Sequence, residues 1–213
     1  MTRNDFSRRR FIRDGAVASA AAWAAPAALS AATHPSNADY LEVGLPKADL
    51  LTPALCVDLD ALEGNIDTMQ STVSANGIGV RPHTKTHKTP AIAHLQMARG
   101  AVGICTAKLT EAEVMFEHGL DEILLTTPNV SAAKLRRAMQ LRRRCDGFVQ
   151  AVDTEANARD LDAAAREAGI IADIVVDVDP GGHRTGVTAG EPALALAQLV
   201  DRSANLRLRG MLC

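Results

Sequence analysis

Hydrophobic and polar positions follow two different rhythms along the chain after residue 50. Short continuous runs rich in Val, Ile and Leu are typical of strands buried on both faces, and they occupy residues 55–57, 78–81, 102–106, 122–126, 147–152, 174–179 and 206–212. Between these runs apolar residues recur three or four positions apart, which predicts helices over residues 60–73, 90–99, 111–118, 132–143, 154–168 and 191–200. Strands separated by helices predict an α/β fold with a parallel sheet covered by helices.

Six successive strand–helix units favour a (β/α)8 TIM barrel over an open sheet. No GxGxxG or Walker motif follows the first strand, which weakens a dinucleotide-binding interpretation. A complete barrel of this kind needs about 250 residues, and the sequence ends at Cys213, inside the run that would form the sixth barrel strand. We therefore expect the chain to be the N-terminal part of a longer protein, with about six of the barrel's units present.

The N-terminal residues have the pattern of an export signal. The basic segment SRRRFIR (7–13) precedes an uncharged, Ala-rich run at 15–33, with small residues suited to cleavage at 28–32. This pattern predicts export rather than a membrane anchor. The order SRRRFI at 7–12 resembles a twin-arginine signal, which a receptor reads as an address. An ordinary secretory signal with a basic start is the alternative.

The sequence thus divides into a twin-arginine signal peptide (1–32), a polar linker (33–49) and the N-terminal part of a barrel (50–213), and it predicts a periplasmic protein. The whole chain has a net charge of −2, and the part after residue 32 has a net charge of −5. This balance does not favour nucleic acid or an anionic membrane surface as a partner.

Composition indicates an aliphatic core. Hydrophobic residues make up 47% of the chain, and the single tryptophan, Trp23, lies in the predicted signal peptide. Four cysteines show no CxxC spacing, and most lie in apolar runs, so we expect buried thiols rather than a metal site. They are Cys56, Cys105, Cys145 and Cys213. Export to an oxidising compartment would also permit a disulfide between two of these cysteines.

The segment RPHTKTHK (81–88) carries five basic residues directly after an apolar run. As the end of the first barrel strand, it would lie at the mouth where barrel enzymes keep their chemistry. Lys85 is the candidate nucleophile, because neighbouring cations favour the neutral amine that attacks a carbonyl. A solvated phosphate-binding loop is an alternative. His83 and His87 are four residues apart, a spacing that brings two metal ligands together only on a helix. Pro82 at the end of a strand argues against a helix here, so a metal site is poorly supported.

A second candidate segment is DVDPGGHRTGV (177–187), in which a buried strand ends in acidic residues. Gly181 and Gly182 allow a tight turn that would present Arg184 at the same mouth as Lys85. The alternative for Arg184 is an ion pair with Asp177 or Asp179 that merely fixes the turn.

These segments together resemble one family of enzymes. RPHTKTHK with the preceding TPALCVDLDALEGNI, GICTAKLTEAEVM (103–115), GLDEILLT (119–126) and DVDPGGHRTGV resemble the fold-type III pyridoxal-phosphate enzymes of the D-threonine aldolase and D-serine dehydratase group. The resemblance covers nearly all of residues 50–213, and its motifs are specific as a set. It implies a barrel of the alanine racemase N-terminal type and a homodimer for the full-length protein.

The resemblance also implies a reaction and its residues. Lys85 would hold pyridoxal phosphate as a Schiff base, and Arg184 and His83 would bind the cofactor. The substrate would be a β-hydroxy D-amino acid, cleaved between Cα and Cβ to glycine and an aldehyde, or alternatively dehydrated. A divalent metal (Mn, Mg or Zn) would be held on a C-terminal β domain beyond Cys213. A non-catalytic barrel that carries pyridoxal phosphate is the alternative from another functional class.

Overall fold

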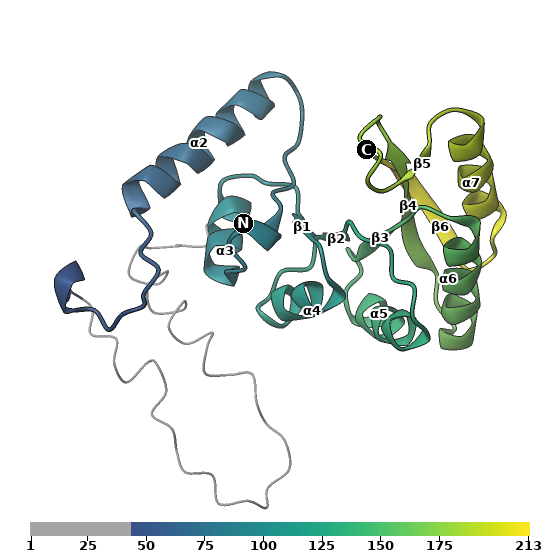
Figure 1. Ribbon diagram of the computed structural model, residues 1–213, viewed down its shortest axis with the longest axis horizontal. Coiled ribbons are helices and arrows are strands. Elements are labelled where there is room, and N and C mark those ends of the chain that lie inside the picture. The colour runs from purple at the N-terminus through teal and green to yellow at the C-terminus, as the bar shows by residue number, and fades with distance from the viewer. Residues whose placement is uncertain (1–43) are drawn as a thin grey trace, which may run out of the picture. The chain divides into compact units, whose positions relative to one another are not determined.

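The computed structural model describes residues 44–213, which form two compact units (Figure 1). One unit takes in residues 44–80 with Thr89–Ala101, and the other takes in Arg81–Lys88 with Val102–Cys213. The predicted signal peptide and most of the predicted linker lie outside the described residues. None of the helices in the described part of the chain is both long and apolar enough to cross a membrane.

The first unit is helical. It contains a 3-10 turn and two helices, η2 (Lys47–Asp49), α2 (Leu59–Ala75) and α3 (Pro90–Ala98). The side chain of Asp58 caps α2 by accepting a hydrogen bond from the Ala61 amide at 3.0 Å. Arg99, just after α3, binds Asp67 of α2 at 2.8 Å and Glu63 at 3.7 Å. Polar contacts therefore tie the two predicted helices together.

Two predicted strands are wrong. Residues 55–57 form no strand, Leu55 and Val57 are exposed, and none of the described strands pairs with them. Residues 78–81 form no strand either. The chain first meets the sheet one residue later, where Pro82 accepts a hydrogen bond from the Cys105 amide at 2.7 Å and His83 forms a single bridge to Cys105. Proline has no N–H to donate, so the ladder cannot be extended through this residue.

The second unit holds a parallel sheet. Its strands are β1 (Ile104–Thr106), β2 (Ile123–Leu125), β3 (Val149–Val152), β4 (Ala172–Asp179), β5 (Val187–Thr188) and β6 (Leu206–Leu212). Strands β1 to β4 pair in chain order, β6 pairs with the other edge of β4, and β5 pairs with the last two residues of β4. Every pairing is parallel, so the predicted α/β architecture and partial barrel are confirmed. Strand β5, with only two residues, was not predicted.

Four helices of this unit alternate with the strands (Figure 1). They are α4 (Leu109–Glu117), α5 (Ala132–Arg144), α6 (Glu155–Ala168) and α7 (Glu191–Arg202). Each lies within two residues of its predicted bounds. Thr154 caps α6 by accepting from the Asn157 amide at 3.2 Å, and Ser131 caps α5 in the same way. Polar caps in front of apolar periodicity explain why these helices were predictable.

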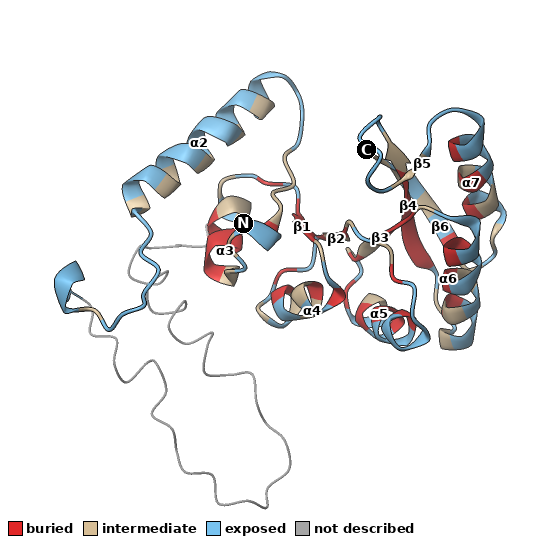
Figure 2. Ribbon diagram, in the orientation of Figure 1, coloured by how far each residue is buried: buried red, intermediate tan, exposed pale blue. Residues whose placement is uncertain are grey.

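The core lies between the sheet and the helices, where Figure 2 shows buried residues on facing sides. Ile174 and Val176 of β4 are fully buried, as are Leu161 of α6 and Val200 of α7. Phe148 is the largest fully buried side chain among the described residues. Apart from Phe148, the buried hydrophobic side chains are aliphatic or sulfur-containing, in line with the predicted aliphatic core. The opposite face of β4 carries Asp173 and Asp177, because successive side chains of a strand alternate between faces.

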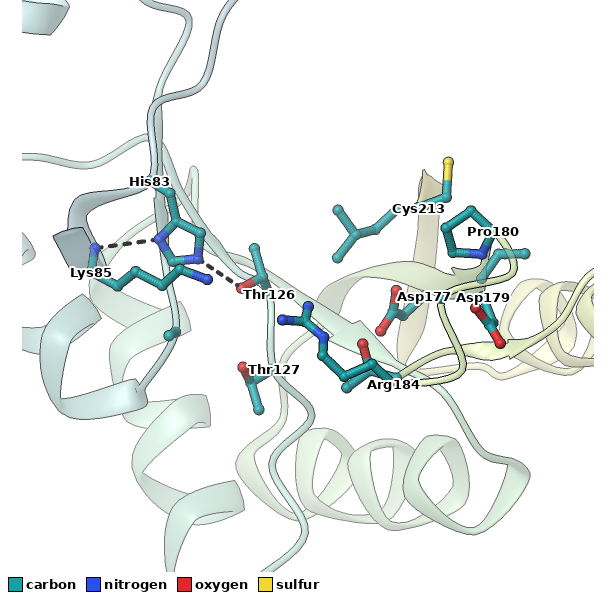
Figure 3. Close-up of a pocket in the computed structure, with 14 residues that line it drawn as sticks. His83, Lys85, Thr126, Thr127, Asp177, Asp179, Pro180, Arg184 and Cys213 are labelled. Atoms are coloured by element: carbon teal, nitrogen blue, oxygen red, sulfur yellow. Dashed lines mark hydrogen bonds between the residues drawn. The ribbon is translucent and has the colours of Figure 1, made fainter.

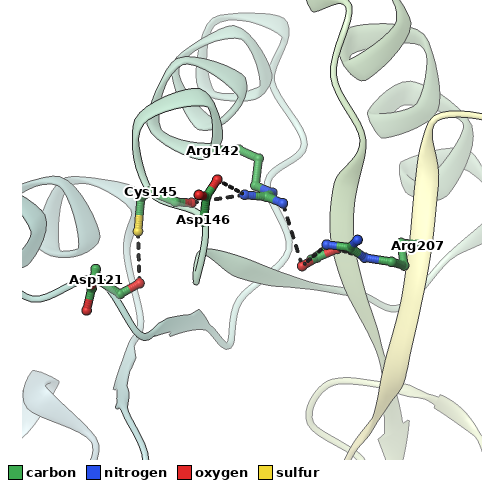
Figure 4. A network of polar contacts seen from close by, with 6 residues as sticks. Asp121, Arg142, Cys145, Asp146 and Arg207 are labelled. Atoms are coloured by element: carbon green, nitrogen blue, oxygen red, sulfur yellow. Dashed lines mark hydrogen bonds and ion pairs between the residues drawn. The ribbon is translucent and has the colours of Figure 1, made fainter.

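An ion-pair network lies at the start of β4 (Figure 4). The buried carboxylate of Asp173 accepts two hydrogen bonds from its cross-strand neighbour Arg207, at 2.6 and 2.8 Å. Arg142 of α5 approaches the same carboxylate at 3.8 Å and also donates to the exposed Asp146 at 3.3 Å. Asp173 therefore links α5, β4 and β6. Burying its carboxylate without the two arginines would cost the free energy of desolvating an unpaired charge.

Beside this network the Cys145 thiol donates to the Asp121 carbonyl at 3.0 Å, a contact drawn in Figure 4. Burial raises the pKa of Cys145 to about 11, so the group remains a thiol at neutral pH. Cys145 and Cys105 are buried as predicted, whereas Cys56 and Cys213 are exposed. All four sulfurs are free thiols.

We expect Asp173→Asn to lower the free energy of unfolding by about 1–3 kcal/mol, because two arginines lose the carboxylate that compensates them. The matched control is Asp146→Asn, which removes an exposed partner of the same Arg142 and should cost less than about 0.5 kcal/mol. Urea unfolding followed by circular dichroism measures both. Equal effects of the two variants would contradict the role of Asp173.

Candidate active site

A cavity of about 690 Å³ opens at the carboxyl end of the parallel strands (Figure 3). All of its lining residues belong to the second unit. They are His83, Lys85, Ala107, Thr126, Thr127, Asp177, Val178, Asp179, Pro180, Gly182, Arg184, Thr185, Leu212 and Cys213. The volume is in the range of small-molecule and cofactor sites. The structure thus brings Lys85, Arg184 and His83, the three site residues predicted from sequence, to one cavity.

Lys85 is carried by a short 3-10 turn, η3 (Thr84–Thr86). The buried Thr84 hydroxyl donates to the Cys105 carbonyl at 3.0 Å, which fastens the turn to β1. The Lys88 amide donates to the Thr84 carbonyl at 2.7 Å and closes the turn. Among the described residues the Lys85 amine has no hydrogen-bond or ion-pair partner. Its backbone is fixed while its amine is available to a ligand.

Lys88, the other lysine of the basic segment, is engaged elsewhere. Its amine lies 3.7 Å from Glu111 of α4. The same Glu111 accepts hydrogen bonds from the Ala107 and Lys108 amides at 3.0 and 3.2 Å, at the start of that helix. Lys88 is absent from the cavity lining. Of these two lysines, only Lys85 therefore lines the cavity.

The loop that presents Arg184 is anchored by Asp179 at the end of β4. This carboxylate accepts hydrogen bonds from the Gly181 amide at 2.9 Å and the His183 amide at 3.0 Å. Desolvation raises the pKa of Asp179, but backbone donors from His183, Gly181 and Gly182 outweigh it and hold that pKa below its ordinary value. The acid therefore remains charged and keeps the turn closed.

Gly186 completes this loop. It has a φ of +96°, and a Cβ there would lie 2.5 Å from the Asp179 amide nitrogen. Only glycine fits this backbone and this close approach.

Figure 3 shows Arg184 and Lys85 extending into the cavity from different sides. The guanidinium has no ion pair within 4.0 Å among the described residues, and Asp179 pairs instead with His183 at 3.1 Å. The structure therefore does not contain the ion pair that was the alternative for Arg184.

Asp177 is a site residue that sequence reasoning considered only as a possible partner of Arg184. It is 5% exposed, it lines the cavity, and its Oδ2 is buried without a hydrogen-bond partner. Burial raises its pKa, and Asp153 adds to this, while a hydrogen bond from Thr185 and the charge of Arg184 oppose it. An acid inside the apolar run DIVVDVD was the available signal.

The three groups define what the cavity can bind. An available amine and an available guanidinium suit a ligand that carries a carbonyl group and negative charge. The unpartnered oxygen of Asp177 suits a hydrogen-bond donor on that ligand. Among residues 44–213 no group of three or more His, Cys, Asp or Glu side chains is placed to hold a metal ion.

Comparison with known proteins identifies the family. Residues 57–213 match the family described as alanine racemase, N-terminal domain. The chain belongs to this family.

Relatives with names describing an activity are similar over most of the chain. A D-threo-3-hydroxyaspartate dehydratase of Delftia sp. (strain HT23) is 38% identical over 164 residues, which are 76% of this chain and 42% of the relative. A D-threonine aldolase of Arthrobacter sp. is 39% identical over 155 residues, 73% of this chain and 41% of the relative. The chain therefore spans less than half the length of these curated relatives.

Solved structures agree with the fold. A D-threonine aldolase from Filomicrobium marinum is 42% identical with a TM-score of 0.78, over 81% of this chain and 46% of that one. An alanine racemase from Streptomyces lavendulae is 21% identical with a TM-score of 0.61, over 73% of this chain and 40% of that one. The racemase supports the barrel fold alone, whereas the aldolase is also similar in sequence.

We expect Asp177→Asn to become increasingly stabilising as the pH rises. The pKa of Asp177 is raised, so the folded protein favours the protonated acid more than the unfolded chain does. The protonated acid therefore stabilises the fold at pH values below the ordinary pKa of 3.8. This contribution to the free energy of unfolding is lost as the pH rises through the folded pKa. Thermal unfolding of the cofactor-free protein between pH 4 and pH 8 measures the difference from the parent. Asp179→Asn is the control of opposite sign, because the pKa of Asp179 is lowered. Parallel pH curves for parent and Asp177→Asn would contradict this assignment.

Proposed function

We propose that the full protein is a pyridoxal-phosphate-dependent lyase that acts on β-hydroxy D-amino acids. The observation that carries this proposal is the Lys85 amine, which has no partner among the described residues and lies in a cavity with the equally unpaired Arg184. Similarity to aldolases and a dehydratase for hydroxylated D-amino acids supports the reaction class. A non-catalytic carrier of the cofactor would need the same amine but no substrate specificity.

The residues of the cavity fit pyridoxal phosphate. Lys85 would hold the aldehyde covalently, and Arg184 would favour negative charge on a cofactor oxygen because a guanidinium keeps its charge at any working pH. Bound pyridoxal phosphate would withdraw electrons from the substrate Cα as a bond there breaks. Asp177 would accept a hydrogen bond with the Oδ2 that has no partner in the protein. His83 is also predicted to bind the cofactor, and it lines the same cavity with its ring nitrogens in contact with Thr126 and the Lys85 amide.

The Lys85 amine lines the cavity and has no partner among the described residues, so it would also be available to accept or donate a proton during the reaction. Retro-aldol cleavage to glycine and an aldehyde is the favoured reaction. Dehydration is the alternative, since the Delftia dehydratase and the Arthrobacter aldolase are 38% and 39% identical to this chain. The products distinguish the two, because dehydration releases ammonia and an oxo acid.

A divalent metal and a homodimer belong to the same proposal for the full protein. A solved structure of a Delftia dehydratase variant is described as a metal-free form, which supports a metal in that relative. Export to the periplasm by the twin-arginine route also belongs to the proposal. The residues that would direct export, Arg8 and Arg9, lie outside the described residues.

We expect borohydride reduction of the protein loaded with pyridoxal phosphate to attach the pyridoxyl group to Lys85. Lys85→Ala should lose the label and reduce turnover of D-threonine and D-threo-3-hydroxyaspartate on the order of 10³-fold or more, because no other lysine among residues 44–213 lines the cavity. Peptide mass spectrometry locates the label. Lys88→Ala is the matched control and should keep it, since Lys88 pairs with Glu111. Label on Lys88 or Lys108 would overturn the assignment, and label without turnover of either substrate would favour the carrier.

We expect the double variant Arg8→Lys and Arg9→Lys to remain in the cytoplasm. The twin-arginine receptor reads the arginine pair rather than its charge, so the conservative change should block export almost completely. Cell fractionation and immunoblotting measure the distribution. Arg3→Lys, outside the pair, is the control and should be exported normally. Unchanged export of the double variant would indicate the general secretory route.

A further inference from the structure

His83 stands directly before the turn that carries Lys85, and both of its ring nitrogens are engaged. Nδ1 lies 3.3 Å from the backbone nitrogen of Lys85. A backbone N–H can only donate, so Nδ1 must be the unprotonated, accepting nitrogen of the ring. The ring thus caps the second residue of η3, as short polar side chains cap the starts of helices.

The other ring nitrogen completes a chain of hydrogen bonds. Nε2 lies 3.2 Å from the Thr126 hydroxyl, just after β2, and both residues are drawn with this contact in Figure 3. The Thr126 hydroxyl donates its only proton to the Thr106 carbonyl at 3.1 Å. It can therefore only accept from His83, so Nε2 carries the proton. Counting donors assigns the neutral Nε2–H tautomer.

We propose that His83 is a positioning residue for Lys85, and that its neutral Nε2–H tautomer holds the turn Thr84–Thr86 at the mouth of the cavity. The role of Lys85 in this statement rests on the proposed function, while the tautomer does not. His83 fastens the turn to the residue after β2, and Thr84 fastens it to β1. The amine of Lys85 keeps its freedom because only its backbone is held.

This arrangement makes the turn sensitive to acid. Protonation would place a second N–H on Nδ1, opposite the Lys85 N–H, and two donors cannot share a hydrogen bond. The charged groups around the ring are Lys85 on its own turn, Glu111 on α4, and Asp177, Asp179 and Arg184 across the cavity. Burial lowers the pKa of His83 below its ordinary 6.5, and the Lys85 charge adds to this, while Glu111 opposes it. The stability contributed by the neutral ring is present above pH 6.5 and is lost as the pH falls through the lower folded pKa.

The tautomer is tested on the full-length protein with ¹⁵N-labelled histidine, both without and with pyridoxal phosphate. Long-range ¹H–¹⁵N spectra identify which ring nitrogen carries the proton, and the signal that disappears in His83→Asn identifies the residue. We expect the Nε2–H form and a titration below that of an ordinary histidine. Thr126→Val leaves the Lys85 N–H opposite Nδ1, so it should keep the Nε2–H form while shifting the Nε2 resonance, whereas Thr127→Val should leave both ring-nitrogen resonances unchanged. An Nδ1–H ring or a cationic ring at neutral pH in the parent would overturn the proposal.

The effect on Lys85 is tested through the affinity for pyridoxal phosphate between pH 5 and pH 8, followed by absorbance. His83→Ala should bind about fivefold more weakly at pH 8, the effect of losing an ordinary cap. His83→Asn can cap at every pH, so it should retain the parent affinity at pH 8 and lose less affinity at pH 5. Parent-like affinity and pH dependence in His83→Ala would overturn the proposal. The tautomer is measured without cofactor, so its test does not depend on the proposed function. If borohydride reduction did not attach the pyridoxyl group to Lys85, the proposed function would be wrong, but the capping role of His83 would still stand.

Discussion

The strand β4 is the constraint on which the second unit depends. It pairs with β3, β5 and β6, and its inward side chains are fixed by the alternation of a pleated strand. One face supplies Ile174 and Val176 to the core beneath the helices. The other places Asp173 at one end of the strand and Asp177 at the other. A shift of one residue in register would put carboxylates in the core and aliphatic side chains in the cavity.

Three acids of this strand show how environment decides the behaviour of one residue type. Asp173 is buried but compensated, because two arginines approach it. Asp177 is buried with an unpartnered oxygen, and burial raises its pKa. Asp179 lies at the strand end, where backbone donors hold its pKa low and its charge closes the loop. The first acid joins strands, the last shapes a loop, and only the middle one is left with an unsatisfied oxygen inside a cavity.

The sequence predicted what depends on local pattern and missed what depends on partners. Helices such as α6 were predictable because a cap, Thr154, precedes the apolar periodicity. Residues 55–57 have strand composition, but a strand also needs a neighbour, and none of the described strands supplies one. Strand β5 is too short to leave a pattern. Lys85 and Arg184 were predicted from basic residues after apolar runs and from the family resemblance, and the structure brings both to one cavity. For Asp177 the signal was an acid inside an apolar run, which sequence reasoning read only as a possible partner of Arg184. The contacts of His83 could not be found, since they depend on Thr126, a residue distant in sequence.

Lys85 and Arg184, the lysine and the arginine that line the cavity, both have a backbone that is held in place by neighbouring residues. The backbone of Lys85 is held by His83 and Thr84, and the loop of Arg184 is held by Asp179 and by a close approach that only Gly186 allows. Neither side chain has a partner of its own among the described residues. A site whose backbone is fixed loses little conformational entropy when a ligand binds, and unpaired cations lose no ion pair. Asp177 lines the same cavity, and its pKa is raised by burial and lowered by the charge of Arg184. A ligand bearing negative charge would interact favourably with both cations, so the electrostatics of the cavity favour the kind of molecule that it is proposed to bind.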